Sequence, residues 1–175
     1  MACDNLTSIL KSCSPGGNLG GVKAIYIAAS EDVSGTTITN GIITAITMSG
    51  SAKFQKFEFN KNSANYVEDS PSDLTVGSTV VTQTITLTLA KRDAAKRAAI
   101  AIATEGQRNL KVIVLDYNGI YWLFGYENDV NITNVTGGSG SAKTDANAYV
   151  ITLVGEESIY APTITSGVIA PIVVA

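Results

Sequence analysis

The chain has 175 residues, of which 45% are hydrophobic and only 15% are charged, against roughly 25% charged in an average soluble protein. The length indicates one domain, or one domain with extended arms, and the low charge favours extensive contacts with other protein surfaces. Fifteen acidic and twelve basic residues give a net charge of −3, which disfavours tight binding to nucleic-acid phosphates, and the absence of histidine argues against most hydrolase and metalloenzyme schemes.

Residues 1–21 are predicted to form an N-terminal arm, because Pro15 and several glycines interrupt any regular element. Cys3 and Cys13 either close one small terminal loop or, as we favour, stay reduced. Asp4 and the lack of an uninterrupted apolar segment argue against a secretory signal here. No stretch approaches the length of a membrane-spanning helix, so no membrane span is expected.

From residue 22 onward, β-branched and aromatic residues alternate with Thr, Ser and Lys, which is typical of β-strands. We expect a first strand at Val22–Ala28 and a second at Thr37–Met48, which Asn40-Gly41 interrupts with a turn or bulge. Lys53–Val67 and Thr79–Lys91 are predicted to form one long antiparallel hairpin. In the returning strand isoleucine and leucine alternate with threonine, so one face is apolar and the other carries hydroxyl groups.

One helix is predicted, at Arg92–Glu105, because this segment is rich in alanine and Gly106 stands where a helix-terminating glycine belongs. One side of the helix carries small apolar residues at helical spacing, namely Ala95, Ala98, Ala99 and Ile102. Such a stripe allows close approach to a sheet, and the favoured use of the helix is to plug an open face of its own sandwich.

The clearest hairpin signal follows the helix. Asn118-Gly119 separates the apolar runs Leu110–Asp116 and Ile120–Tyr126, and a type I′ turn needs the positive φ angles that these two residues adopt easily. Trp122 in the second strand is assigned to the core rather than to ligand stacking. Two further strands, joined by a loop at residues 136–147, are predicted at Val130–Val135 and Ala148–Val154.

The apolar C-terminal segment has no assigned regular element, and residues 158–175 are expected to form an extended arm. Because a free apolar tail would aggregate in water, this arm either lies on its own domain or docks on another subunit. The predicted fold class is therefore mainly β: an antiparallel β-sandwich or partly closed barrel over residues 22–157, with one flanking helix at about 92–105 and an arm at each end.

Motifs that could carry chemistry are weak. Gly137–Thr144 departs by one residue from a phosphate-binding loop, but a strand rather than a helix follows it. Glu156 and Glu157 are adjacent, so on a strand their carboxylates point to opposite faces. Lysines around Phe57 and Phe59 form a faint basic-aromatic patch, for which a partly solvated strand is the favoured explanation. We therefore predict no catalytic, cofactor or metal-binding residue and no enzyme activity.

Three segments, within residues 22–157, carry a resemblance to a known family. They are a strand that runs into the helix (TITLTLAKRDAAKRAAIAIA), the hairpin after it (LKVIVLDYNGIYWLFGYENDVNI), and a glycine-rich loop with the last strand (SGSAKTDANAYVITLVGEE). In order and composition they resemble the tail tube (major tail) proteins of tailed bacteriophages, a family related in fold to the tube proteins of type VI secretion machines.

The resemblance implies a structural virion protein that forms rings, usually hexamers, whose inner sheets join edge to edge and which stack into a conduit for DNA ejection. It also implies contacts with other tail proteins (terminator, baseplate and possibly sheath), passage of double-stranded DNA without specific binding, and a place in the virion tail after assembly in the host bacterial cytoplasm. The mildly acidic chain fits this role, because it would repel the DNA backbone rather than hold it.

Contacts between subunits are expected in the long hairpin and the C-terminal arm, at Phe57, Phe59, Pro71, Leu74, Ile164, Ile169, Ile172, Val173 and Val174. One alternative is a head-decoration or tail-completion protein of the same kind of particle, which would bind the capsid or connector without stacking on itself. Another is a β-sandwich module that binds a carbohydrate or small ligand, which would need Trp122 and tyrosines exposed on one face.

Overall fold

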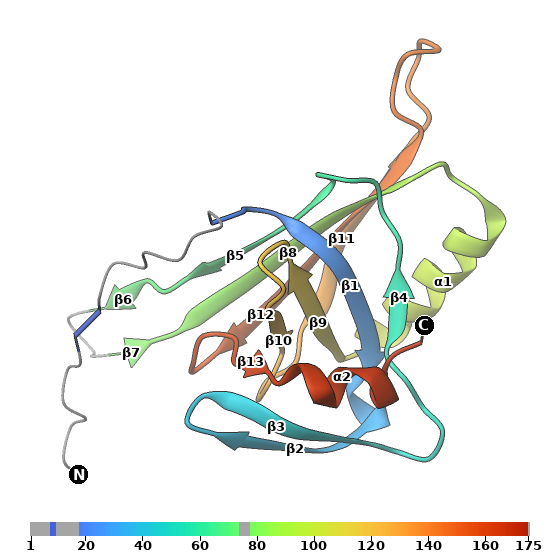
Figure 1. Cartoon of the computed structure of the whole chain (residues 1–175). Coiled ribbons are helices and arrows are strands. Elements are labelled where there is room, and N and C mark those ends of the chain that lie inside the picture. The colour runs from blue at the N-terminus through green and yellow to red at the C-terminus, as the bar shows by residue number, and fades with distance from the viewer. Residues whose placement is uncertain (1–7, 10–17, 74–77, 175) are drawn as a thin grey trace.

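A computed structural model describes residues 8–9, 18–73 and 78–174 (Figure 1). Two sheets face each other as a partly open sandwich, and one main helix, α1 (Ala94–Thr104), flanks them. The mainly β fold class predicted from the sequence is thus confirmed. Residues 1–7 and 10–17 of the predicted N-terminal arm lie outside the described residues.

The larger sheet has seven strands in the order β2-β3-β13-β10-β9-β1-β4, and all neighbouring pairs are antiparallel except β13 with β3. Its strands are β1 (Val22–Ala29), β2 (Val33–Thr39), β3 (Ile42–Met48), β4 (Gln55–Phe57), β9 (Leu110–Asp116), β10 (Tyr121–Phe124) and β13 (Thr163–Ile164). The predicted turns at Asn40-Gly41 and Asn118-Gly119 are confirmed, and Asn40 and Gly41 have positive φ angles of 52° and 74°. The second turn is not of the expected type I′, because only Gly119 has a positive φ angle there, at 85°, and its N–H donates to the Asp116 carbonyl at 3.2 Å.

The smaller sheet has four antiparallel strands in the order β11-β12-β8-β5. These are β5 (Ala64–Asp69), β8 (Val81–Ala90), β11 (Asn131–Gly138) and β12 (Ala148–Glu157), and the short strands β6 (Ser72–Asp73) and β7 (Ser78–Thr79) extend the β5–β8 hairpin. The expectation of one hairpin from Lys53 onward needs correction, because β4 pairs with β1 in the other sheet. A turn in which Asn62 has a φ angle of 62° separates β4 from β5.

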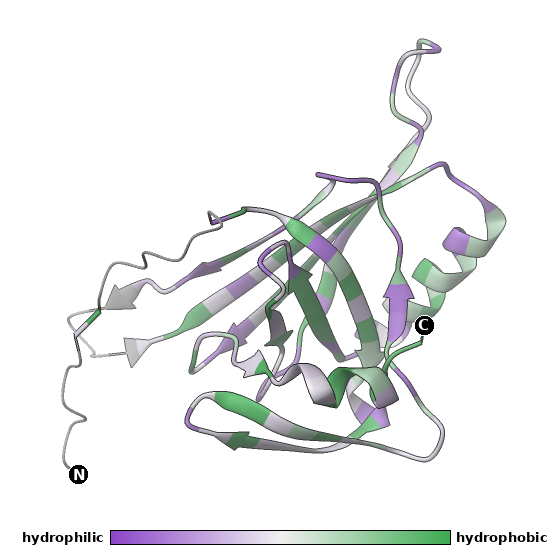
Figure 2. Cartoon of the chain, viewed as in Figure 1, coloured by the Kyte–Doolittle hydropathy of each residue, from purple (hydrophilic) through white to green (hydrophobic). Residues whose placement is uncertain are grey.

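The core has two parts, one on each face of the seven-stranded sheet. The first lies between the sheets and includes Ile25 and Val112 from one sheet and Leu87 and Ile151 from the other. The second lies on the opposite face, beneath α2 (Ser166–Ile172). Consequently every residue of β9 is buried, and Figure 2 shows this strand in hydrophobic colour along most of its length.

The C-terminal segment is part of this second core, which corrects the expectation of an extended arm. β13 lies between β3 and β10, and α2 places Ile169 and Ile172 in the same cluster as Ile113 of β9. The backbone continues to pair after α2, since Phe54 N–H donates to the Ile172 carbonyl and Val174 N–H to the Phe54 carbonyl. The physical reason is that burial on its own sheet removes this apolar segment from water without a partner.

The predicted helix is confirmed, with Asp93 as its N-cap accepting a hydrogen bond from the Lys96 amide at 2.8 Å. Its buried residue is Ile100, which belongs to the core between the sheets. The expected stripe is instead largely exposed, including Ile102 at 56%. The helix therefore contributes a single buried side chain to the core between the sheets rather than lying flat on a sheet.

Candidate functional site

The outer face of the four-stranded sheet is covered with small polar side chains. β8 alternates between residues buried in the core and half-buried threonines on the outside. The strand pairing places the neighbours of these threonines on the same outer face, because directly opposed residues project to the same side. This threonine face comprises Thr82, Thr84, Thr86 and Thr88 of β8, Val150, Thr152, Val154 and Glu156 of β12, Asn65, Val67 and Asp69 of β5, and Asn134 and Thr136 of β11.

The four-stranded sheet ends in two edge strands, β5 and β11. Among the described residues, neither strand pairs with another on its outer side. β11 contains no charged residue and no proline, and these are the usual protections of an edge against pairing with another chain. Val67 on β5 is a large apolar residue that is 52% exposed. Both edges thus retain backbone groups able to pair with a further strand.

Two hairpins project from opposite ends of the same sheet (Figure 1). β8 begins at Val81, opposite Glu157, and ends at Ala90, opposite Ala148. The β6–β7 hairpin therefore extends from one end of the sheet, and the loop 139–147 between β11 and β12 extends from the other end. Figure 1 shows β6, β7 and the loop 139–147 extending away from the sandwich.

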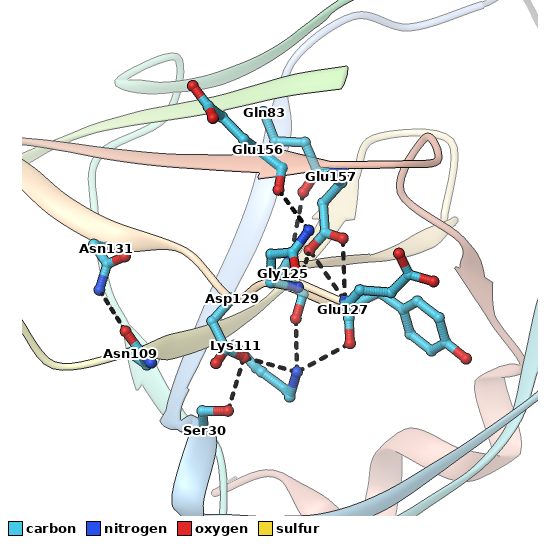
Figure 3. Close-up of polar contacts among 12 residues, drawn as sticks. Ser30, Gln83, Asn109, Lys111, Gly125, Glu127, Asp129, Asn131, Glu156 and Glu157 are labelled. Atoms are coloured by element: carbon cyan, nitrogen blue, oxygen red, sulfur yellow. Dashed lines mark hydrogen bonds and ion pairs between the residues drawn. The ribbon is translucent and has the colours of Figure 1, made fainter. Parts of the chain in front are cut away.

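A buried polar network fixes the segment 125–130, which connects the two sheets (Figure 3). Lys111 Nζ lies 2.8 Å from Asp129 Oδ1 and donates to the carbonyls of Gly125 and Tyr126 at 2.7 and 3.1 Å. Ser30 Oγ donates to the same Asp129 oxygen at 2.7 Å. No buried side-chain nitrogen or oxygen in the described part of the chain lacks a hydrogen-bond partner. The network therefore acts as structural support for this connection.

Glu157 and Gly155 hold the same segment from β12. The Glu157 carboxylate accepts hydrogen bonds from the amides of Glu127 and Asn128 at 3.1 Å, and burial, outweighing these bonds, raises its pKa. Gly155 is needed because a Cβ atom there would lie 2.5 Å from Val130 Cγ1, far inside van der Waals contact. Sequence reasoning missed this support, since adjacent glutamates gave no sign that one would be buried.

The residues predicted as inter-subunit contacts fall into three groups. Ile164, Ile169 and Ile172 are buried in the second core, so their prediction as contacts is wrong, and Val173 packs partly buried beside them. Phe57 and Phe59 are half-buried against the first core. Pro71 and Val174 are exposed. Leu74 lies outside the described residues.

The weaker motifs have ordinary structural explanations. One motif is the glycine-rich loop that resembles a phosphate-binding loop. In this loop the backbone amides of Ser141 and Ala142 donate hydrogen bonds to the Asp145 carboxylate at 2.7 and 2.8 Å. Lys56 of the basic-aromatic patch pairs with Glu58 at 3.3 Å. Trp122 packs partly buried against the first core and donates to Asp116, in agreement with its core assignment.

Comparison with protein-family models, with curated proteins and with solved structures finds no significant match to this chain. Within residues 8–9, 18–73 and 78–174, no group of three or more Cys, Asp or Glu side chains is arranged to hold a metal ion. No helix in this part of the chain is long and apolar enough to cross a membrane. The candidate site is therefore the four-stranded sheet itself, with its threonine face, its two free edges and its two projecting hairpins.

Proposed function

We propose that the chain is a structural subunit that assembles with copies of itself into rings, and that these rings stack into the tail tube of a tailed phage. The observation that carries the proposal is the four-stranded antiparallel sheet with a free strand at each edge. Closing a ring through these edges pairs the backbone groups along both edges of this sheet, so the sheet offers no edge for uncontrolled aggregation.

The number of strands in the sheet suits such a ring. Because the sheet is antiparallel and has four strands, β5 and β11 run in opposite directions. When copies related by rotation stand side by side, β5 of one copy meets β11 of the next in the antiparallel sense. The sheet can therefore continue from subunit to subunit without changing its pattern.

The threonine face supports the proposed role as a conduit. In a closed ring this face lines the lumen, because the other face of the sheet is covered by the core. Asp69 and Glu156 are its charged residues, and it carries no lysine or arginine. Double-stranded DNA would thus meet hydroxyl and amide groups and a weak repulsion, rather than cations that grip its phosphates.

The C-terminal segment contributes nothing to this proposal, since it is folded onto its own sheet. The proposal depends on the edges of the four-stranded sheet instead of on an apolar tail. The ligand-binding alternative would require Trp122 exposed for stacking, and its packing against the first core gives no support for that use.

Cysteine cross-linking tests the lateral contact directly. In a variant with Cys3→Ser and Cys13→Ser, one cysteine is placed on β5 by Val67→Cys and another on β11 by Asn134→Cys or Thr136→Cys. Oxidation of concentrated protein should give a ladder of disulfide-linked species that ends at the closed ring. A matched chain with the β5 cysteine alone should give no species larger than a dimer.

Sedimentation and negative-stain micrographs of the unmodified chain complete the test. Rings or tubes are expected at high concentration. A chain that stays strictly monomeric, with no rings or tubes in the images, overturns the proposal. Binding to capsids or connectors without self-association would favour the head-decoration or tail-completion alternative.

A further inference from the structure

The two ends of the four-stranded sheet carry opposite charge. One end lies where β8 finishes, and there the Lys91 amide donates to the Asn147 carbonyl at 2.7 Å. Arg92 and Arg97 border a hollow shared with the base of the β11–β12 hairpin, and Arg92 stacks on Tyr149 at 5.1 Å. We call this the basic end, and its exposed cations are Lys61, Lys91, Arg92, Arg97 and Lys143.

The acidic residues at the basic end are already engaged. Asp93 pairs with Lys96 at 2.9 Å and caps α1, so these two charges offset each other. Asp145 is held by the amides of its own loop. Asp145 keeps its negative charge, but the five exposed cations outnumber it, so this end keeps a net positive charge.

The opposite end carries exposed carboxylates. Asp69 of β5 and Glu156 of β12 both lie opposite Thr82 of β8, in one row across the sheet. Glu127 lies beside them, because its amide donates to Glu157, and Tyr160 in the following loop is 58% exposed. No lysine or arginine occurs in residues 62–90, 112–142 or 144–175. This acidic end therefore has no cation on the strands and hairpins that form it.

On the basis of the proposed function, we infer that copies in successive rings dock head to tail, with the basic end of one copy against the acidic end of a copy in the next ring. Like ends repel, so rings cannot join back to back, and the contact extends in one direction only. Each exposed ion pair contributes little alone, but every subunit of a ring repeats the contact. Tyr160 adds an aromatic surface on which a guanidinium of the basic end can stack.

Charge reversal at one end tests the inference. Lys61→Glu with Arg97→Glu and Lys143→Glu leaves more carboxylates than cations at the basic end, so both ends become acidic. Asp69→Lys with Glu156→Lys leaves more cations than exposed carboxylates among the residues named at the acidic end, so both ends become basic. These side chains are exposed, and none of them forms a hydrogen bond with another residue that the structure describes. Each variant should still form rings through its free edges, but the fraction of stacked rings should fall on the order of tenfold or more.

Mixing gives the decisive result, because an acidic-ended ring complements a basic-ended ring. An equal mixture of the two variants should recover stacking, and a single chain with all five substitutions should stack on its own. Lys23→Glu with Lys53→Glu and Lys56→Glu is the matched control, since it changes the net charge as much as the first variant but its positions lie in or next to β1 and β4 of the other sheet. This control should stack as the unmodified chain does.

Counting single rings and stacked rings in micrographs distinguishes the proposed ring formation from the inferred head-to-tail stacking. If both end variants stack as well as the unmodified chain, or if the mixture fails to stack, the inference is wrong while the rings keep the proposed function intact. If the unmodified chain forms no rings, the proposed function fails instead. Raising the ionic strength from about 0.1 M to about 1 M, where the screening length falls from about 10 to about 3 Å, should shorten the stacks without opening the rings.

Discussion

At the scale of single residues, Lys111 shows how a cation is tolerated in a buried position. Its three donor positions are used by Asp129 and by the carbonyls of Gly125 and Tyr126. Lys111→Met should lower the free energy of unfolding by about 3 kcal/mol, because the Asp129 carboxylate is left buried without its cation. Urea unfolding followed by tryptophan fluorescence measures this change.

The double variant Lys111→Met with Asp129→Asn is the control for this prediction. It removes both charges, so it should be more stable than Lys111→Met alone. A double variant that is less stable than the single one would show that packing of the lysine stem, rather than its charge, is what matters at this position.

Glu157 should make stability depend on pH in the direction opposite to most carboxylates. Burial raises its pKa above the ordinary value of 4.5, so the folded chain holds this proton more tightly than the unfolded chain. Its contribution to stability is therefore largest below pH 4.5 and declines as the pH rises through the raised pKa. The difference in unfolding free energy between the unmodified chain and Glu157→Gln should grow as the pH falls from about 7 to about 4.

This difference isolates Glu157, because the remaining carboxylates are common to both chains and cancel. A difference that stays flat, or that grows toward neutral pH, would contradict the raised pKa. The pKa of Asp145 is lowered by its amide hydrogen bonds, so its own contribution is lost as the pH falls through that lowered value.

At the scale of elements, the C-terminal segment joins parts of the seven-stranded sheet. β13 is the strand through which the β2–β3 hairpin reaches β10. Ile169→Ala in α2 should cost about 2–5 kcal/mol of stability, because the side chain is 4% exposed and its removal leaves a cavity. Val174→Ala, at a site that is 38% exposed, should change stability by less than about 0.5 kcal/mol. Thermal unfolding of the two variants side by side checks both values.

An Ile169→Ala chain that melts like the unmodified chain, but fails to assemble, would restore the idea of a C-terminal arm that docks on a neighbour. Equal and large losses in both variants would instead show that the last residues pack more tightly than their exposure indicates.

At the scale of the whole molecule, two kinds of contact are separated in space. The free edges of β5 and β11 offer backbone hydrogen bonds across the sheet, whereas the basic and acidic ends offer charge along it. Backbone pairing is insensitive to salt, and contacts between exposed charges are screened by it. Rings and stacks are therefore expected to respond differently to the same change of solvent.

Local patterns in the sequence determined the strands, the helix and the tight turns. Alternation in β8, alanine in α1, and the Asn-Gly pairs each act over a few residues, so they can be recognised without knowledge of partners. The same alternation placed threonines on one face of β8, but it could not identify which other strands share that face, because register depends on residues far apart in the chain.

Only the tertiary structure decided where the C-terminal segment lies, which strands stand at the edges, and how charge is divided between the ends. β13 is two residues long and α2 contains Pro171, so neither has a periodicity that a sequence can display. The buried Lys111–Asp129 pair and the acidic row of Asp69 and Glu156 bring together residues separated by long stretches of chain. Such contacts depend on packing and strand pairing across the whole fold, whereas strands, helices and turns depend on neighbouring residues alone.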